Sequence, residues 1–201
     1  MELVIATTNQ GKLREIKELL KGSGLRIKSL AGFPGCPDVV EDGATFRENA
    51  LKKARAVAEY TGRLALADDS GLEVDALDGA PGVFSARFSG RDADDLKNNK
   101  RLLRLMRDVP DEKRGAQFVC VLALAGPEGS GVREKVIRGV VRGKVAREMR
   151  GPRGFGYDPL FYYARAGRTF AEMAPEEKNA VSHRGKALKK LKDYFLFAKR
   201  K

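Results

Sequence analysis

Short apolar runs alternate with amphipathic stretches in the first third of the chain. Residues 3–6 form an apolar run ended by polar residues, which is typical of a buried strand. Apolar residues recur at helical spacing between positions 13 and 20, and the glycines that follow predict the end of a helix. Residues 26–30 alternate as a strand does, and Thr45-Phe46-Arg47-Glu48 has the pattern of a capping box. A second helix should therefore begin there, and the apolar run at 64–67 predicts a further buried strand.

The rest of the chain combines loop, helix and paired-strand patterns. Residues 79–90 are rich in Gly, Ser and Pro and predict a loop, and 93–106 has apolar residues at helical spacing. Residues 118–125 and 136–141 predict two strands joined by a Gly- and Pro-rich turn, and a last helix is predicted over 182–198. Strands that alternate with helices indicate an α/β fold, and the hairpin indicates a mixed sheet. No internal repeat interrupts the pattern, so we expect a single domain over residues 1–201.

The composition is that of an ordinary globular domain. Hydrophobic residues make up 42% of the 201 positions, which supports a core, and no apolar run approaches the length that crosses a membrane. The segment Glu2-Leu3-Val4-Ile5-Ala6 lacks the features of a secretory signal. The two cysteines, Cys36 and Cys120, have neither metal-ligand spacing nor the pattern of a disulfide framework. We therefore expect a cytoplasmic protein that does not engage a membrane.

The net charge of +12 fits either a nucleic acid or a polyanionic small molecule as a partner. Acidic residues are interspersed with the basic ones along most of the chain, which is also the pattern of a solvated surface. Aromatic residues that could stack on splayed bases are few, and no RNA- or DNA-binding motif is present. We expect that no nucleic acid is required. A basic nucleic-acid-binding protein, in which Asp68 and Asp69 are structural, stays as an alternative.

A candidate phosphate-binding segment, Thr7-Thr8-Asn9-Gln10-Gly11-Lys12, lies between the first predicted strand and helix. Backbone N–H groups at a helix start favour an anion. Thr8 and Asn9 can donate hydrogen bonds, Gly11 allows a close approach of the backbone, and Lys12 supplies charge. The alternative is an ordinary N-cap in which Thr8 or Asn9 satisfies the first donors of the helix.

Candidate metal ligands follow the apolar run at 64–67. Asp68 and Asp69 should lie at the C-terminal end of that strand, and if the strand persists they point to opposite sides. One carboxylate would then face the site and the other would brace a turn at Ser70-Gly71, while Glu41 could add a second oxygen ligand. Magnesium usually takes one or two protein carboxylates together with phosphates and water. The alternative is turn chemistry alone.

Two segments near the C-terminus could surround a nucleobase. Phe155 could stack on the ring and Asp158 could accept from a ring N–H, while Lys178, His183 and Arg184 could donate to exocyclic oxygens. Such a donor-rich pocket prefers a 6-oxo purine, because buried donors that face an amino group would be left unpaired. Taken singly, these residues also fit a core phenylalanine and a surface histidine at a helix start.

With these residues, the chain resembles the inosine-triphosphate pyrophosphatase family, whose members remove non-standard purine nucleotides. The resemblance covers nearly the whole chain. Six motifs carry it, in order: Thr7-Thr8-Asn9-Gln10-Gly11-Lys12; Thr45-Phe46-Arg47-Glu48-Asn49-Ala50 with Lys53; Ala67-Asp68-Asp69-Ser70-Gly71-Leu72; Gly79-Ala80-Pro81-Gly82 with Ser85-Ala86-Arg87-Phe88; Gly154-Phe155-Gly156-Tyr157-Asp158-Pro159; and Lys178-Asn179 with Ser182-His183-Arg184.

The resemblance implies a homodimer that uses Mg²⁺ to hydrolyse dITP, ITP and XTP to the monophosphate and pyrophosphate. It implies an elongated α/β fold, in which a long mixed sheet flanked by helices forms two lobes with the active site in the cleft. Asp69 would bind the metal and take the proton from water, and Glu41 would be the second metal ligand. The substrate-binding residues would be Thr7 to Lys12 with Lys53 for the triphosphate, Ser70 close to the substrate, and Phe155, Gly156, Tyr157, Asp158, Lys178, Ser182, His183 and Arg184 for the base. A pyrophosphatase for modified pyrimidine nucleotides is a second alternative, against which the donor-rich segment 178–184 argues.

Overall fold

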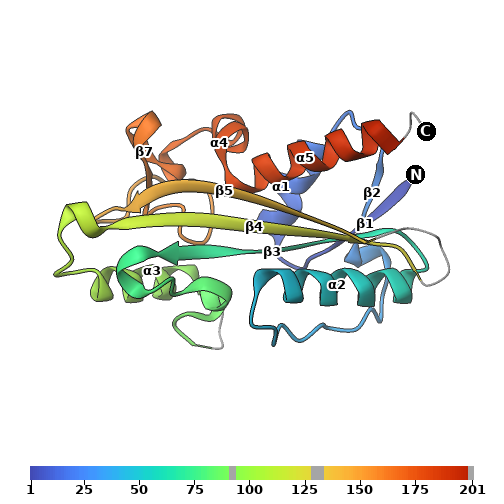
Figure 1. Cartoon of the computed structure of the whole chain (residues 1–201), viewed down its shortest axis with the longest axis horizontal. Helices are drawn as coiled ribbons and strands as arrows, with labels where there is room; N and C mark the ends of the chain where they lie inside the picture. Colours follow the sequence, from blue (N-terminus) through green and yellow to red (C-terminus); the bar gives the residue numbers. More distant parts are fainter. Residues whose placement is uncertain (91–93, 128–133, 199–201) are drawn as a thin grey trace. The chain divides into compact units, whose positions relative to one another are not determined.

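Seven strands form one sheet, which Figure 1 shows with its flanking helices. The computed structural model describes residues 1–90, 94–127 and 134–198. The strands are β1 (Glu2–Ala6), β2 (Arg26–Ser29), β3 (Ala65–Val74), β4 (Gly115–Ala125), β5 (Lys135–Val145), β6 (Phe161–Tyr163) and β7 (Arg168–Thr169), in the sheet order β2-β1-β3-β4-β5-β6-β7. β1 runs parallel to β2 and β3, whereas β6 is antiparallel to β5 and β7. The predicted α/β fold with a mixed sheet is therefore confirmed.

The chain forms two compact units. The first unit comprises Met1–Asp69, Cys120–Gly139 and Arg184–Lys201, and the second comprises Ser70–Val119 and Val140–His183. The main helices are α1 (Gln10–Leu20), α2 (Phe46–Thr61), α3 (Asp95–Leu105), α4 (Pro175–Val181) and α5 (His183–Ala198). β3, β4 and β5 each contribute residues to both units.

In the first unit, α1 and α5 lie on one face of the strands and α2 lies on the other (Figure 1). The core joins Ile5 of β1 and Leu66 of β3 to Ile16 of α1 and Leu188 of α5, all of them fully buried. The apolar positions at helical spacing thus face this core, as predicted. Thr45 is the N-cap of α2, and its Oγ1 accepts from the N–H of Glu48 at 3.1 Å.

In the second unit, aromatic side chains form much of the core. Phe118 and Phe161 have ring centroids 4.6 Å apart, and the Phe161 and Phe170 centroids are 4.8 Å apart. Leu102 and Met106, on and just after α3, complete the cluster. The sequence did not predict β6 and β7, because strands of three and two residues are too short to show a period-two pattern.

β3 extends well beyond its predicted end. The prediction placed Asp68 and Asp69 at the C-terminal end of a strand with a turn at Ser70-Gly71, and it is wrong, because the strand continues to Val74. Gly71 serves a close contact rather than a turn: a Cβ there would lie 2.3 Å from the Oγ of Ser85. That hydroxyl accepts from the N–H of Leu72 at 2.9 Å.

Other predicted elements differ mainly in extent. Residues 178–181, for which no helix was predicted, are helical in α4, and the last helix begins one residue later than predicted. Both hairpin strands are longer than predicted. The predicted loop at 79–90 contains the 3-10 segment Gly82–Arg87, and most of the predicted turn at 126–131 lies outside the described residues.

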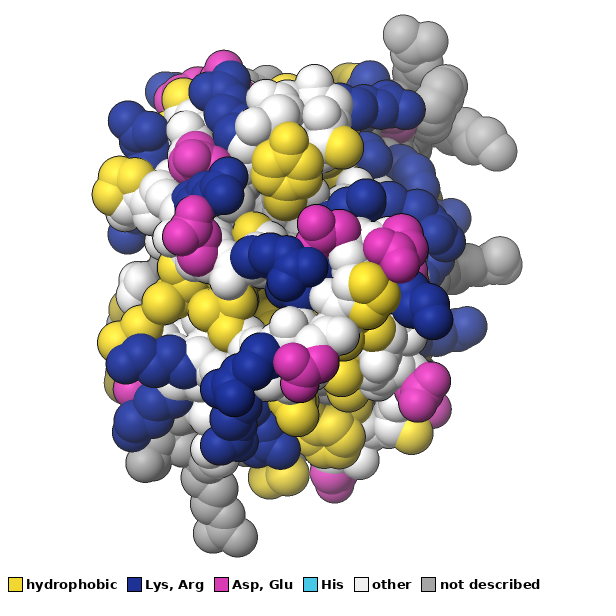
Figure 2. Space-filling view, turned by 90° about the vertical axis from the view of Figure 1, so that its left-hand side faces the viewer, with side chains coloured by type: hydrophobic (Ala, Val, Ile, Leu, Met, Phe, Trp, Pro, Cys, Tyr) yellow, Lys and Arg dark blue, Asp and Glu magenta, His cyan; other side chains and the backbone are white. Residues whose placement is uncertain are grey.

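The surface mixes charges of both signs. On the face shown in Figure 2, acidic side chains lie among the many Lys and Arg side chains, and hydrophobic side chains also reach the surface. This is the interspersed pattern that the sequence predicts. None of the helices in the described part of the chain combines the length and the apolar character that a membrane crossing requires.

Candidate active site

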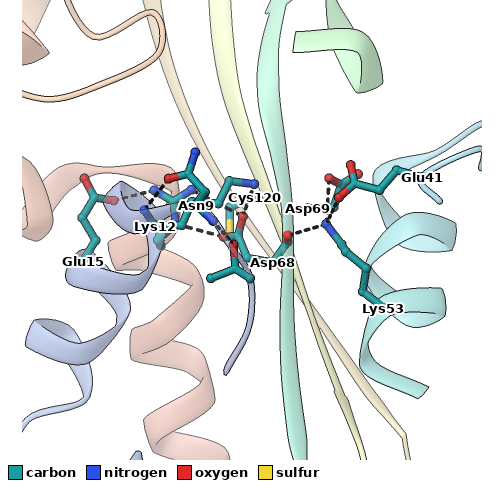
Figure 3. A network of polar contacts seen from close by, with 10 residues as sticks. Asn9, Lys12, Glu15, Glu41, Lys53, Asp68, Asp69 and Cys120 are labelled. Atoms are coloured by element: carbon teal, nitrogen blue, oxygen red, sulfur yellow. Dashed lines mark hydrogen bonds and ion pairs between the residues drawn. The ribbon is translucent and has the colours of Figure 1, made fainter. Parts of the chain in front are cut away.

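Two neighbouring carboxylates on β3 point to opposite sides of the strand, as Figure 3 shows. Asp68 is 1% exposed and Asp69 is 4% exposed, so both are buried. Successive side chains of a strand alternate between its faces. The conditional prediction that the two carboxylates would diverge is therefore confirmed, and each one has its own surroundings.

Asp68 is enclosed by cations. Its Oδ2 accepts from Arg184 Nε at 2.9 Å, its Oδ1 pairs with Lys12 Nζ at 2.8 Å, and the thiol of Cys120 donates to Oδ2 at 3.1 Å. Arg184 also pairs with Glu15 on α1. Burial alone would raise the pKa of Asp68, but Arg184 and Lys12 outweigh it and hold that pKa well below its ordinary value. Asp68 is therefore ionised at neutral pH and anchors these cations, and it does not brace a turn.

Asp69 has one close cation and one unpaired oxygen. Lys53 Nζ lies 3.4 Å from Asp69 Oδ1, 2.7 Å from Glu41 Oε1 and 2.8 Å from the main-chain oxygen of Asp68. Asp69 Oδ2 is buried and has no hydrogen-bond partner among the described residues. Burial raises the pKa of Asp69 and outweighs the opposing effects of Lys53 and Lys12. Burial would lower the pKa of Lys53, but Asp69 and Glu41 together raise it.

This arrangement fits a hard divalent cation. The carboxylates of Glu41 and Asp69 both contact the ammonium of Lys53, and no donor among the described residues reaches Asp69 Oδ2. No group of three or more His, Cys, Asp and Glu side chains suited to a metal occurs in the described part of the chain. Two carboxylates suffice for magnesium, which usually completes its shell with water and substrate phosphates.

Residues at the start of α2 hold the segment that carries Glu41. The buried Asn49 accepts from the N–H of Gly43 at 2.8 Å through its Oδ1, and Glu48 Oε2 accepts from the N–H of Ala44, also at 2.8 Å. A Cβ at Gly43 would lie 2.7 Å from that Asn49 oxygen. The role of Asn49 was not predicted, although the residue stands in one of the six motifs. A polar residue near a helix start is usually explained by capping alone, whereas Asn49 binds a loop residue.

The candidate phosphate segment forms the start of α1. Asn9 Oδ1 accepts from the N–H of Lys12 at 2.9 Å, Thr7 Oγ1 accepts from the N–H of Asn9 at 3.2 Å, and Gln10 Nε2 donates to the main-chain oxygen of Thr8 at 3.1 Å. Asn9 is thus the N-cap, and Thr8 is not. These local bonds fix the conformation of the segment. Its phosphate role stays a prediction, as does that of Gly11.

The candidate base-binding loop lies in the second unit and is held by Asp158. Its Oδ2 accepts from the N–H of Phe155 at 2.9 Å and from Lys178 Nζ at 2.5 Å. Gly154 has φ +79°, and a Cβ there would lie 2.2 Å from that oxygen. Lys178 Nζ also lies 4.8 Å from the centroid of the Phe155 ring. Phe155, Asp158 and Lys178 therefore come together, as the base-binding prediction requires.

Two residues of α3 fix the same loop. Asp95 Oδ2 accepts from the N–H of Gly156 at 2.6 Å, and Asn99 Nδ2 donates to the main-chain oxygen of Gly156 at 2.8 Å. The hydroxyl of Tyr157 donates to the main-chain oxygen of Ser85 at 2.9 Å, and burial raises the pKa of that tyrosine. Asp95 and Asn99 were missed because nothing in the sequence links them to residues some 60 positions away.

The remaining predicted site residues have varied surroundings. His183 is buried and stacks on Phe118 with ring centroids 4.6 Å apart, so the alternative of a surface histidine is wrong. Ser182 is buried and its N–H donates to the main-chain oxygen of Lys178 at 2.8 Å. Ser70 follows Asp69 on β3 and is half-buried. No pattern in the chain predicted that Arg184, expected at the base, pairs with Asp68.

Comparison with known proteins assigns the family. The sequence model of the Ham1 family matches residues 3–194. The chain belongs to the Ham1 family. A relative from Desulforamulus reducens named dITP/XTP pyrophosphatase is 56% identical over 94% of this chain and 93% of its own length. One with the same name from Geobacter sulfurreducens is 54% identical over 96% of this chain and 95% of its own.

Solved structures agree with this Ham1 assignment. A structure described as a HAM1 protein from Coxiella burnetii is 45% identical, covers 98% of this chain and of its own, and gives a TM-score of 0.88. One of a nucleoside-triphosphatase, or dITP/XTP pyrophosphatase, from Mycobacterium abscessus is 49% identical, covers 95% of this chain and 98% of its own, and gives a TM-score of 0.76. The family resemblance that the six motifs indicated is therefore confirmed over nearly the whole length of this chain.

Proposed function

We propose that this Ham1-family chain hydrolyses non-standard purine nucleoside triphosphates, namely dITP, ITP and XTP, to the monophosphate and pyrophosphate. The observation that carries the proposal is the buried Oδ2 of Asp69 near Glu41 and Lys53, which has no hydrogen-bond partner among the described residues. Buried acceptors without a donor are uncommon in folded proteins, and a bound ion is one explanation for such an oxygen. The names of the relatives, dITP/XTP pyrophosphatase, support the same substrates.

In this proposal, Asp69 takes a proton from the attacking water. The water oxygen forms a bond to phosphorus, and the anhydride bond between the nucleoside monophosphate and the pyrophosphate breaks. Glu41 and Asp69 would hold Mg²⁺, which when bound neutralises phosphate charge and lowers the pKa of water. Lys53 and the segment Thr7–Lys12 would hold the triphosphate, with Ser70 next to it. Removal of the proton by a positioned carboxylate is worth about 10²- to 10⁴-fold in rate.

Base recognition would come from the aromatic ring of Phe155 and from polar groups around it. Lys178, His183 and Arg184 would donate to the exocyclic oxygens of a 6-oxo purine, and Asp158 would accept from a ring N–H. The 2.5 Å contact between Lys178 and Asp158 supports a fixed donor–acceptor pair. Gly156, Tyr157 and Ser182 would shape the backbone around the base.

We further propose that the whole chain, residues 1–201, acts as one pyrophosphatase domain and that it works as a homodimer in the cytoplasm. These points follow the family resemblance. The two alternatives, a pyrophosphatase for modified pyrimidine nucleotides and a nucleic-acid-binding protein, are not favoured, because the relatives are named for dITP and XTP.

The deciding experiment measures pyrophosphate release from dITP and XTP beside dATP and dGTP, with Mg²⁺ and with EDTA. We expect release that depends on Mg²⁺ and is largely confined to dITP and XTP. Absence of release from every substrate would reject the proposal. Salt-sensitive binding of an oligonucleotide by that inactive protein would then favour the nucleic-acid alternative.

A further inference from the structure

The carboxylate of Asp68 is shared by two cations that the proposed function assigns to different parts of the substrate. Oδ1 lies 2.8 Å from Lys12 Nζ and 3.4 Å from Arg184 Nη2, and Oδ2 lies 2.9 Å from Arg184 Nε. Lys12 belongs to the predicted phosphate segment and Arg184 to the predicted base-binding set. Asp68 itself has no assigned contact with the substrate.

The geometry makes the two cations interdependent. Both of them approach Oδ1, and only the contact with Lys12 is short. The side chains of Asp68 and Arg184 are 0% and 2% exposed, whereas that of Lys12 is 16% exposed. Lys12 is therefore the partner that can turn toward an incoming anion, while the guanidinium stays enclosed.

A phosphate that attracts Lys12 would remove the competing cation from Oδ1. Arg184 already donates to both carboxylate oxygens, at 2.9 Å to Oδ2 and at 3.4 Å to Oδ1, and it pairs with Glu15 through Nη1. Without Lys12 the longer contact could shorten to give an even two-point fork, which fixes the guanidinium plane more strictly. An arginine whose plane is fixed presents its remaining donors in a defined direction. By reciprocity, a base that orders Arg184 would favour release of Lys12 from Oδ1 toward the phosphate.

We propose that Asp68 is a positioning residue that couples recognition of the base to binding of the phosphates, through its shared ion pairs with Arg184 and Lys12. This inference rests on the proposed function, because it uses the roles assigned there to the two cations. It predicts that affinity for the base depends on a phosphate-binding lysine.

The chain offers a matched control in Lys53. It is also assigned to the triphosphate, but it contacts Asp68 only through the main-chain oxygen, at 2.8 Å. A substitution of Lys53 therefore removes a phosphate contact and leaves the shared carboxylate with both of its cations. An effect on base affinity that Lys12→Gln has and Lys53→Gln lacks would then point to the carboxylate of Asp68.

The test compares Lys12→Gln with Lys53→Gln by their affinity for inosine, which has no phosphate, measured by calorimetry. We expect Lys12→Gln to tighten inosine binding by about 5- to 150-fold, the usual range of coupling between sites, because Arg184 no longer shares Oδ1 with a second cation. Lys53→Gln should leave inosine affinity unchanged. With Asp68→Asn already present, Lys12→Gln should no longer change inosine affinity.

An inosine affinity that Lys12→Gln leaves unchanged or weakens would overturn the inference. An effect of Lys12→Gln that persists at full size with Asp68→Asn would overturn it as well. Should Asp68→Asn fail to fold, the comparison of Lys12→Gln with Lys53→Gln decides alone.

A binding measurement separates failure of this inference from failure of the proposed function. Lack of pyrophosphate release from dITP by the unaltered chain would reject the function. Calorimetry can still measure inosine binding with and without inorganic triphosphate. Coupling predicts tighter inosine binding in the presence of triphosphate for the unaltered chain and for Lys53→Gln, but not for Lys12→Gln. Equal inosine affinity with and without triphosphate in the unaltered chain contradicts the coupling.

Discussion

Asp68 and Asp69 are adjacent, identical in chemistry and almost equally buried, yet their surroundings differ completely. Asp68 is compensated by Arg184 and Lys12, and its pKa is held well below the ordinary value. Asp69 has a longer contact with Lys53 and a raised pKa, and in the part of the chain that the structure describes one of its oxygens has no hydrogen-bond partner. Burial alone therefore does not mark a catalytic carboxylate. The distinguishing feature is incomplete compensation, which leaves an oxygen available for a metal or a proton.

The largest effect should come from Asp69→Asn. Removal of a proton acceptor that also binds the metal should lower turnover of dITP by at least about 10²- to 10⁴-fold. Folding should be preserved, because the amide relieves the burial of a charge. Pyrophosphate release and thermal unfolding measure the two effects, and Asp193→Asn, an exposed acid on α5, is the control. Near-normal turnover by Asp69→Asn would remove this residue from the catalytic role.

Asp68→Asn should produce the opposite profile, with stability as its main loss. It leaves Arg184 buried with one carboxylate partner fewer, and breaking a buried ion pair costs about 3–5 kcal/mol. Urea unfolding monitored by circular dichroism measures the change in the free energy of unfolding. Stability equal to that of the unaltered chain would show that the Asp68 cluster contributes nothing to the fold.

Glu41→Gln tests the other carboxylate on the Asp69 side. This substitution removes one of the two charged ligands of the metal. Loss of a residue that only supports a metal ligand already weakens metal affinity by about tenfold or more. The Mg²⁺ concentration for half-maximal turnover should therefore rise by at least about tenfold. Direct titration with Mn²⁺, followed by electron paramagnetic resonance, gives a reading that does not depend on turnover. Lys52→Gln is the control, because it removes the cation paired with Asp42, the residue next to Glu41, and leaves Glu41 itself intact. An unchanged metal requirement would exclude Glu41 as a ligand.

A smaller effect concerns pH. Asp68 has a lowered pKa, so its stabilising contribution is present above the ordinary value of 3.8 and is lost only as pH falls through the lower folded value. Asp69 has a raised pKa, so in the metal-free protein it takes up its proton above 3.8. Metal binding requires the ionised form. Metal affinity should thus weaken on acidification before the fold does, which metal titrations and unfolding curves across the acid range compare directly. Loss of both at one pH would contradict the contrast.

The sequence predicted the periodic parts of this molecule and several of its clusters. Alternation and caps located the strands and helices of the first unit, and the motif around Phe155 and Lys178 indicated a group that does come together. The continuation of β3 past Asp69 was missed because Ser70-Gly71 is a good turn sequence in isolation. Here Gly71 instead admits the hydroxyl of Ser85. Tertiary contacts of this kind leave no periodic trace in the chain.

The charged partners were harder still to predict. Arg184 and Asp68 are 116 positions apart, and no local rule joins them. His183 at a helix start has the pattern of a surface residue, and only the stacking on Phe118 shows otherwise. Asn49 was visible in a motif, but its bond to Gly43 depends on the path of a loop that has no regular structure.

The uninterrupted course of β3 limits how the length of this chain can evolve. One residue inserted between Ala65 and Asp68 would turn every later side chain to the opposite face, so that Asp68 would take the place of Asp69 beside Lys53. Asp69 would then lie on the face of Lys12 and Arg184 but about 7 Å farther along the strand than Asp68 does now. The inserted sequence would still contain the motif intact and yet leave Lys12 and Arg184 without a carboxylate at the position of Asp68. The strand can therefore accept substitutions far more readily than single insertions or deletions, and descendants of this sequence should keep the spacing from Ala65 to Val74 even where the side chains change.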